Sequence, residues 1–211
     1  MGGNAAEARG DRVSDETIWL AKARAGDQEA FSHLIEMYQT PIFNLAYRML
    51  GDPAEAEDAA QEAFLRAYTR LATYDTSRSF KTWLFSIASH HCIDRLRKRR
   101  LTWLSLDEPL PADAAPALAD QSPGPEEQTA RGEQTALIQQ HLARLSPEDR
   151  AVIVMRYWYD FSYEEIAQAT GATVSAVKSR LHRARVSLAE RLADERQMNG
   201  QKSRRLAEVL S

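Results

Sequence analysis

The sequence has few of the residues that disulfide frameworks and membrane anchors require. It contains a single cysteine among 211 residues, Cys92, so no internal disulfide can form and a reducing compartment is expected. No stretch approaches the ~20 consecutive apolar residues of a membrane span, and no membrane insertion is expected. The first residues are polar and lack the apolar core of a secretory signal. These features predict a soluble, cytoplasmic protein.

Signals for catalytic chemistry are equally scarce. His90 and His91 are adjacent rather than one helical turn apart, and the other histidines are scattered. Cys92 has no partner pattern nearby, and no glycine-rich phosphate loop is present. We therefore predict no catalytic residues, no metal site and no cofactor, and an enzyme is the least favoured of the functions considered below.

Strand signals are few, whereas nearly every periodic segment has the spacing of an amphipathic helix. We predict an all-α protein of two small helical domains joined by a flexible acidic linker, the second a four-helix domain containing a helix-turn-helix. The expected boundaries are a disordered N-terminus at 1–14, a first domain at 15–100, the linker at 101–133, a second domain at 134–195 and a tail at 196–211.

Capping residues and periodicity divide the first domain into helices. Helices are predicted over 15–25 and 28–50, with Pro41 as a candidate kink or break in the second. Asp52 as N-cap and Pro53 at the first helical position start the next helix. A further helix begins near Phe80 and continues into the basic run RLRKRR.

Charge is sorted into blocks, although the net charge is only −3. Residues 101–133 are rich in proline, alanine and acids, with Arg131 as their only cation, which indicates an extended linker. The basic runs RLRKRR at 95–100 and KSRLHRAR at 178–185 lie on either side. Such sorting indicates partners of more than one kind.

The second domain ends with the pattern of a helix-turn-helix. An earlier helix is predicted to begin directly after Ser146. A capping box formed by Ser162 and Glu165 marks the start of a short helix, and Gly171 marks its end. A longer helix then runs over about 174–194, with short side chains and cations on the face opposite its apolar stripe. Such a face fits the major groove of DNA, although a solvated basic face on an ordinary bundle is the alternative interpretation. The residues predicted to contact DNA are Ser175, Lys178, Ser179, Arg180, His182 and Arg183.

The upstream basic run follows aromatic residues on the same predicted helix. Phe80, Trp83 and Phe85 precede the cations at 95–100. Rings that stack on bases and cations that follow phosphates suit single-stranded nucleic acid. Trp83 and Phe85 are better explained as core residues, whereas a nucleic-acid role is favoured for the loop at 76–81.

A third feature is the face of the 53–71 segment that points away from its alanine-rich core side. It carries residues at i, i+3, i+4 and i+7, namely Asp58, Gln61, Glu62 and Leu65. A leucine among acids and an amide on an exposed face suggests a protein docking surface. Taken alone, the segment is better explained as a solvated acidic face.

Four segments together resemble the sigma factors of bacterial RNA polymerase, of the extracytoplasmic-function (ECF) type. They are GDPAEAEDAAQEAFLRAY, FKTWLFSIASHHCIDRLRKRR, LSPEDRAVIVMRYWYDFSYEEIA and VSAVKSRLHRAR, and the similarity covers nearly all of 27–192 except the linker. The resemblance implies a non-catalytic subunit that binds core RNA polymerase, reads minus-35 and minus-10 promoter elements and helps to open the DNA. Many members carry Pro and Gly or Glu where this chain has residues 173–176, a departure that concerns which minus-35 sequence is read.

The resemblance also implies a role for each surface. The face of Asp58, Gln61, Glu62 and Leu65 would dock on the polymerase clamp, and the helix from 174 would read the minus-35 element. Residues 15–100 would form sigma region 2, and residues 134–195 would form region 4. The linker would run through polymerase channels normally occupied by nucleic acid, and an anti-sigma factor is an expected partner. Binding of the minus-10 element, as duplex and as melted non-template strand, would involve Ser79, Phe80, Lys81, Arg95, Arg97, Lys98 and Arg99.

A helix-turn-helix regulator that binds a duplex operator without polymerase stays open as an alternative. Such a regulator needs neither an exposed acidic docking face nor an aromatic and basic strand-opening segment. A gel shift separates the two, since a regulator binds duplex DNA alone and a sigma factor is expected to need core polymerase.

Overall fold

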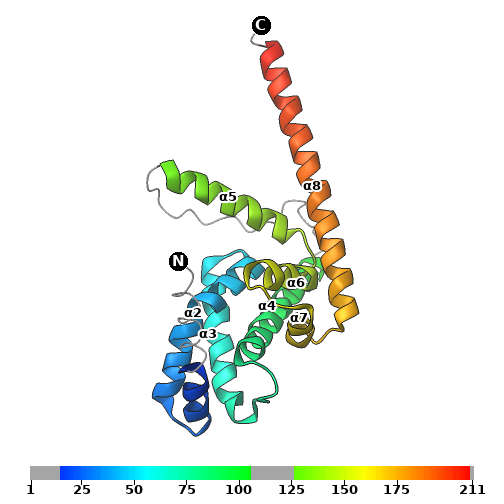
Figure 1. The fold of residues 1–211 in the computed structure, drawn as a ribbon. Coiled ribbons are helices and arrows are strands. Elements are labelled where there is room, and N and C mark those ends of the chain that lie inside the picture. Colours follow the sequence, from blue (N-terminus) through cyan, green and yellow to red (C-terminus); the bar gives the residue numbers. More distant parts are fainter. Residues whose placement is uncertain (1–14, 106–125, 210–211) are drawn as a thin grey trace, which may run out of the picture. The chain divides into compact units, whose positions relative to one another are not determined.

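The computed structural model describes residues 15–105 and 126–209, which form two compact helical units (Figure 1). Within these ranges no strand is present, and the predicted all-α class with two helical units is confirmed. The first unit holds a helix at residues 15–24, α2 (Gln28–Leu50), α3 (Pro53–Arg70), the 3-10 turn η1 (Leu71–Thr73) and α4 (Phe80–Ser105). The second unit holds α5 (Glu126–Ala143), α6 (Pro147–Trp158), α7 (Tyr163–Thr170) and α8 (Val174–Val209).

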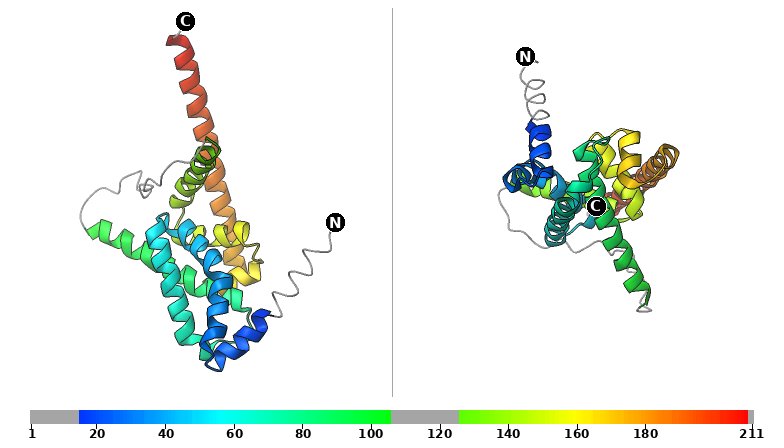
Figure 2. Two further views of the ribbon diagram at one scale, coloured as in Figure 1. Left: turned by 90° about the vertical axis from the view of Figure 1, so that its left-hand side faces the viewer. Right: turned by 90° about the horizontal axis from the view of Figure 1, so that it is seen from below.

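The core of the first unit lies between α2, α3 and α4, each of which packs against the other two. Leu34, Ile42 and Leu45 of α2 are fully buried. The buried side of α3 is a row of alanines that starts at Ala56 and ends at Ala67, with Phe64 among them. Small side chains let neighbouring helices approach closely, because the interaxial distance depends on the residues at the contact. Figures 1 and 2 accordingly show α2 and α3 side by side.

Local capping chemistry sets the ends of these helices. The carboxylate of Asp27 accepts from the Ala30 N–H at 3.1 Å, and that of Asp52 accepts from the Glu55 N–H at 2.8 Å. α2 ends at Gly51, whose φ of 86° lies in the left-handed region that glycine adopts without a steric cost. Pro41 does not split α2, which continues through it with buried residues on both sides. Burial therefore offsets the lost backbone hydrogen bond of an internal proline, a cost of about 3 kcal/mol.

Helices occupy both ends of the segment predicted as a linker. α4 continues to Ser105 rather than ending near residue 100, and α5 begins at Glu126 rather than near 134. The apolar residues after the basic run extend α4, and the acids at the start of α5 favour a helix N-terminus through the helix dipole. Residues 106–125 of the linker, and the N-terminus at 1–14, lie outside the described residues.

The last helix is longer than the sequence pattern indicates. α8 was expected to end near residue 194, with a separate tail at 196–211, but it continues to Val209 and extends past α6 and α7 (Figure 1). The residues after 194 contain no proline and are mostly good helix formers, which explains the continuation. Among the described residues, no helix has the length and apolar character that crossing a membrane requires.

Candidate nucleic-acid and protein interfaces

The short helix α7, the turn after it and α8 form the predicted helix-turn-helix. Ser162 Oγ accepts from the Glu165 N–H at 3.1 Å, and Glu165 Oε2 accepts from the Ser162 N–H at 2.7 Å, which completes the capping box. Gly171 ends α7 with a φ of 64°, and its N–H donates to the Ala167 carbonyl. Thr173 Oγ1 then accepts from the Ala176 N–H at 3.1 Å and caps α8. The start of α7 is thus set by its capping box, and the start of α8 by the left-handed Gly171 and the Thr173 cap.

One face of α8 is buried and the other is open. Val177, Leu181 and Ala184 are buried and anchor α8 against α6 and α7. The predicted DNA-binding residues lie on the other side and are exposed, apart from the half-buried Arg180: Ser175, Lys178, Ser179, Arg180, His182 and Arg183. This arrangement has the form of a recognition helix, with short side chains at its N-terminus and cations beyond.

Two of these cations also contact other helices. Arg183 Nη2 lies 3.3 Å from Asp149 Oδ1 in the first turn of α6, and the Arg183 side chain is still 63% exposed. Lys178 Nζ lies 5.8 Å from the centre of the Tyr163 ring. Both cations therefore stay accessible while an adjacent helix limits their range of orientations.

Arg156 and Tyr163 belong to the same surface, although neither was predicted from the sequence. The guanidinium carbon of Arg156 lies 5.4 Å from the centre of the Tyr163 ring, and its Nη1 donates to the Phe161 carbonyl at 2.8 Å. Tyr163 follows the capping Ser162 directly, and that position at the start of the first helix of the motif is the signal that points to it. Arg156 and Lys178 together place positive charge beside the N-terminus of α7, where anions are favoured.

The loop before α4 is ordered by its own polar side chains. Asp75 accepts from the Ser77 N–H at 2.9 Å and from Ser77 Oγ at 2.7 Å, and these bonds hold the pKa of the Asp75 carboxyl below its ordinary value. Ser79 Oγ accepts from the Thr82 N–H at 3.1 Å and so caps α4. Ser79 is exposed and Lys81 is half-buried. Both predicted DNA contacts therefore lie at an accessible helix start.

Phe80 is the exception among the predicted minus-10 residues, because its side chain is buried. Its side chain is only 2% exposed, and its ring centre lies 5.6 Å from that of Tyr38, 5.9 Å from Tyr74 and 5.7 Å from Trp83. The Tyr38 hydroxyl in turn donates to Glu16 Oε2 at 2.8 Å, which ties the helix at 15–24 to this cluster. Phe80 is thus part of the core, and its ring is not available to a base.

The other two aromatic residues of α4 differ from each other. Phe85 is fully buried, which confirms its assignment to the core. Trp83 was also expected in the core, but it is half-buried and packs its ring on Tyr74 at 4.9 Å between centres. Of Phe80 and Trp83, the two aromatic residues at the start of α4, only Trp83 is partly accessible to solvent.

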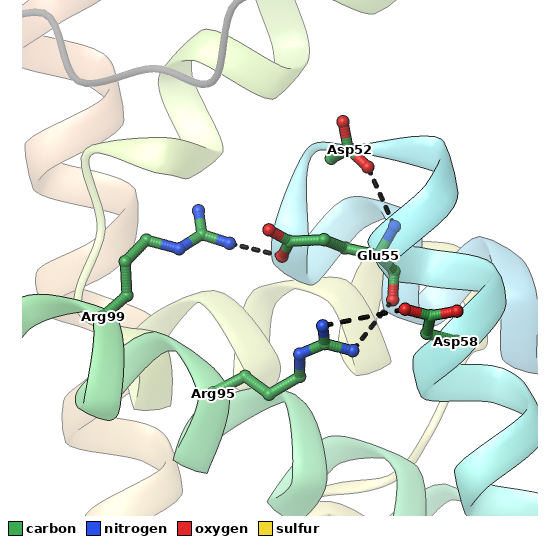
Figure 3. Close-up of polar contacts among 5 residues, drawn as sticks. All are labelled: Asp52, Glu55, Asp58, Arg95 and Arg99. Atoms are coloured by element: carbon green, nitrogen blue, oxygen red, sulfur yellow. Dashed lines mark hydrogen bonds and ion pairs between the residues drawn. The ribbon is translucent and has the colours of Figure 1, made fainter.

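The basic run of α4 contains both exposed cations and cations that contact α3, and Figure 3 shows the latter, Arg95 and Arg99. Arg97 and Lys98 are exposed, with Arg97 Nη1 3.9 Å from Asp94 Oδ1. Arg95 Nη1 donates to the Glu55 carbonyl at 3.4 Å, and its Nη2 lies 4.0 Å from Asp58 Oδ2. Arg99 Nη2 forms an ion pair with Glu55 Oε2. Two of the predicted DNA-binding cations are therefore directed at carboxylates of the neighbouring helix.

The predicted docking face lies on the exposed side of α3, opposite the alanine row. Asp58 is 71% exposed and Leu65 is 59% exposed. Gln61 is exposed, and Glu62 is half-buried, with its Oε1 accepting from Arg66 Nε at 2.6 Å. That hydrogen bond holds the pKa of the Glu62 carboxyl below its ordinary value. An exposed leucine among polar side chains is consistent with a docking surface, and Asp58 adjoins the basic run through Arg95.

One exposed aromatic residue near this face was not singled out from the sequence. Tyr68 is 43% exposed, and its ring centre lies 4.9 Å from that of Phe31 on α2. It follows Leu65 by three positions, so the two side chains share one face of α3. That spacing is the signal that extends the apolar part of the docking face.

Two family models match the chain, one in each helical unit. The Sigma-70 region 2 model matches residues 34–102, and the Sigma-70, region 4 model matches residues 135–188. The first covers α3 and the basic run of α4, and the second covers the helix-turn-helix.

Whole-chain relatives agree with these matches. The ECF RNA polymerase sigma factor SigW of Bacillus subtilis is 37% identical over 179 residues, which cover 83% of this chain and 95% of that protein. The RNA polymerase sigma-H factor of Pseudomonas aeruginosa is 32% identical over 173 residues, which cover 80% of this chain and 89% of that protein.

Solved structures have the same fold. The structure of CnrH in complex with the cytosolic domain of CnrY matches with a TM-score of 0.61 and 28% identity, over 85% of this chain and 98% of that one. The sigma factor RpoE of Bartonella quintana, in complex with the anti-sigma factor NepR, matches with a TM-score of 0.57 and 24% identity, over 77% of this chain and 96% of that one. This chain belongs to the extracytoplasmic-function (ECF) type of RNA polymerase sigma factors, which give the polymerase its promoter specificity in transcription initiation.

Proposed function

We propose that the chain binds core RNA polymerase through α3, reads the minus-35 element with α8, and recognises and opens the minus-10 element with the loop at 76–81 and α4. It acts as a non-catalytic subunit in the cytoplasm, where the polymerase transcribes. The observation that carries this proposal is α8 itself, whose apolar stripe is buried while its short side chains and cations face outward.

We assign residues 15–100 to sigma region 2, residues 134–195 to region 4 and residues 101–133 to the connection between them. The helical residues found at both ends of 101–133 leave the assignment of function unchanged, because they lie outside the DNA-contacting positions. In region 2, Ser79 and Lys81 contact the melted strand, and the exposed Arg97 and Lys98 contact phosphates.

On α8, Ser175, Lys178 and Ser179 are proposed as base readers because they lie within the first two turns. Arg183 is proposed as a phosphate contact, since its long exposed side chain lies further along the helix. Lys178→Ala should change which minus-35 sequence is preferred, with a lost bidentate base contact costing about 1–3 kcal/mol. Arg183→Ala should weaken binding to all promoters alike and lower the salt slope of binding by about 0.9.

The test is transcription by reconstituted polymerase from a promoter library randomised at the minus-35 element, at two salt concentrations. Glu190→Gln on the same helix, beyond the proposed contacts, is the control. If neither Lys178→Ala nor Ser175→Ala shifts the preferred sequence, α8 is not the reader, and specificity lies in the first unit or in DNA shape.

We propose an anti-sigma factor as a further partner. The support is that the structures with this fold include a sigma factor in complex with an anti-sigma factor. Competition tests this proposal: an anti-sigma protein that covers Leu65 and Tyr68 should displace core polymerase from the wild-type chain in a pull-down.

A further inference from the structure

The ion pair between Arg99 and Glu55 joins the basic run of α4 to the first turn of α3 (Figure 3). Each of the two side chains is 35% exposed, so both are half-buried against the helices. Glu55 is held from its backbone side as well, because its N–H donates to the capping Asp52 carboxylate at 2.8 Å. The carboxylate is therefore fixed in place rather than carried on a mobile turn.

The second pair between the same helices is looser. Arg95 Nη2 lies 4.0 Å from Asp58 Oδ2, and the Asp58 side chain is 71% exposed. Exposed pairs at that distance contribute little, whereas half-buried pairs with direct hydrogen bonds are screened less by solvent and salt. Of the two ion pairs, the one between Glu55 and Arg99 is therefore the stronger interaction between α3 and the basic run.

A guanidinium that is paired with a carboxylate binds a phosphate less readily than a solvated guanidinium does. Carboxylate and phosphate oxygens bind the same fork of N–H donors, so the two anions compete for it. Each phosphate that a cation neutralises contributes about 0.9 to the salt slope of DNA binding. If one arginine is kept from a phosphate, the protein loses a contribution to DNA-binding affinity that does not depend on the DNA sequence.

We infer that Glu55 is a positioning residue that withholds Arg99 from promoter phosphates and so limits the sequence-independent part of minus-10 binding. The inference rests on the proposed DNA-contacting role of α4. It divides the basic run by function: the exposed Arg97 and Lys98 bind phosphate, and Arg99 clamps α4 to α3.

The experiment uses holoenzyme reconstituted from the full chain and core RNA polymerase, with a forked DNA of fixed sequence as the probe. Binding is measured across a salt series for the wild type and for Glu55→Gln, which keeps the side-chain shape but removes the charge. The released Arg99 should steepen the salt slope by about 0.9, which corresponds to about a 3.5-fold change in affinity between 50 and 200 mM salt. A residue that only stabilises the fold would change the thermal midpoint and leave this slope unchanged.

Four further variants make the result specific. Glu57→Gln removes the same charge from an exposed position of α3, where Glu57 Oε1 accepts from Gln61 Nε2 of the same helix at 3.5 Å, and should leave the slope unchanged. Arg99→Ala alone should also leave it unchanged, and Glu55→Gln combined with Arg99→Ala should return to the wild-type slope. Lys98→Ala should lower the slope by about 0.9, which tests the proposed role of α4 separately.

Two results would overturn the inference. An unchanged or shallower slope in Glu55→Gln means that Glu55 does not withhold Arg99. A shallower slope in Arg99→Ala alone means that Arg99 already binds phosphate in the wild type. If Lys98→Ala has no effect, the proposed DNA contact of α4 fails as well, and that failure is visible independently of Glu55.

Discussion

Truncation of Phe80 is expected to destabilise the first unit rather than to remove a DNA contact. The side chain is 2% exposed and packs on the rings of Tyr38, Tyr74 and Trp83. Replacing a buried phenylalanine by alanine usually costs about 3–5 kcal/mol, and a domain has only about 5–15 kcal/mol in total. Phe80→Ala should therefore remove a large share of the unfolding free energy of this unit.

Phe80→Leu is the matched control, because it keeps most of the apolar volume and loses the ring contacts. Its expected cost is about 1–1.5 kcal/mol, since aromatic pairs contribute about 0.5–1.5 kcal/mol beyond burial. Chemical denaturation followed by circular dichroism measures both variants, and permanganate reactivity of promoter thymines in the holoenzyme measures strand opening. We expect Phe80→Leu to open promoters nearly as the wild type does. If Phe80→Leu keeps the stability of the wild type but no longer opens promoters, Phe80 acts on the DNA and not through the core.

Three more predictions concern the other surfaces. Leu65→Glu should reduce pull-down of core polymerase while changing stability by less than ~0.5 kcal/mol; it is a cleaner probe than a change at Glu62, whose carboxylate pairs with Arg66. The pKa of His91 lies below its ordinary 6.5, first because the side chain is partly buried and then because Arg66 and Arg95 are nearby. As the pH falls, the unfolded chain therefore binds a proton at this histidine before the folded chain does. The stability of the fold should consequently decrease as the pH drops below about 6.5. Denaturation midpoints measured over a pH series should show a smaller decrease for His91→Gln than for the wild type. Ser162→Ala removes the capping box and should lower the stability of the second unit by about 0.5–2 kcal/mol in thermal unfolding, whereas an equal midpoint would show that the cap contributes nothing.

Helix starts are predictable from this sequence because capping is local. α3, α6 and α7 begin directly behind Asp52, Ser146 and Ser162, whose side chains bind backbone N–H groups three residues ahead. The helix-turn-helix follows from the same signals, together with the left-handed Gly171. These features depend only on residues that are close in the sequence.

Features that depend on distant residues were not predictable in the same way. Arg99 meets Glu55, which is 44 residues away in the sequence, and periodicity alone cannot show that a cation is directed at another helix. Phe80 is buried because Tyr38 and Tyr74 cover it, although its position at the start of a helix after a polar loop is equally typical of an exposed residue. The end of α8 was not predicted correctly because no proline after residue 194 stops the helix.

Run-off transcription with purified core RNA polymerase on a genomic promoter library distinguishes a sigma factor from a regulator that acts alone. Core polymerase alone, polymerase with the full chain, and polymerase with the Leu65→Glu variant are compared on the same templates. We expect specific transcripts from a defined subset of promoters only when the wild-type chain is present, with a marked loss for the variant. Transcription that is independent of the chain, together with tight binding of the chain alone to duplex DNA, would contradict this expectation and would indicate a regulator that acts without the polymerase.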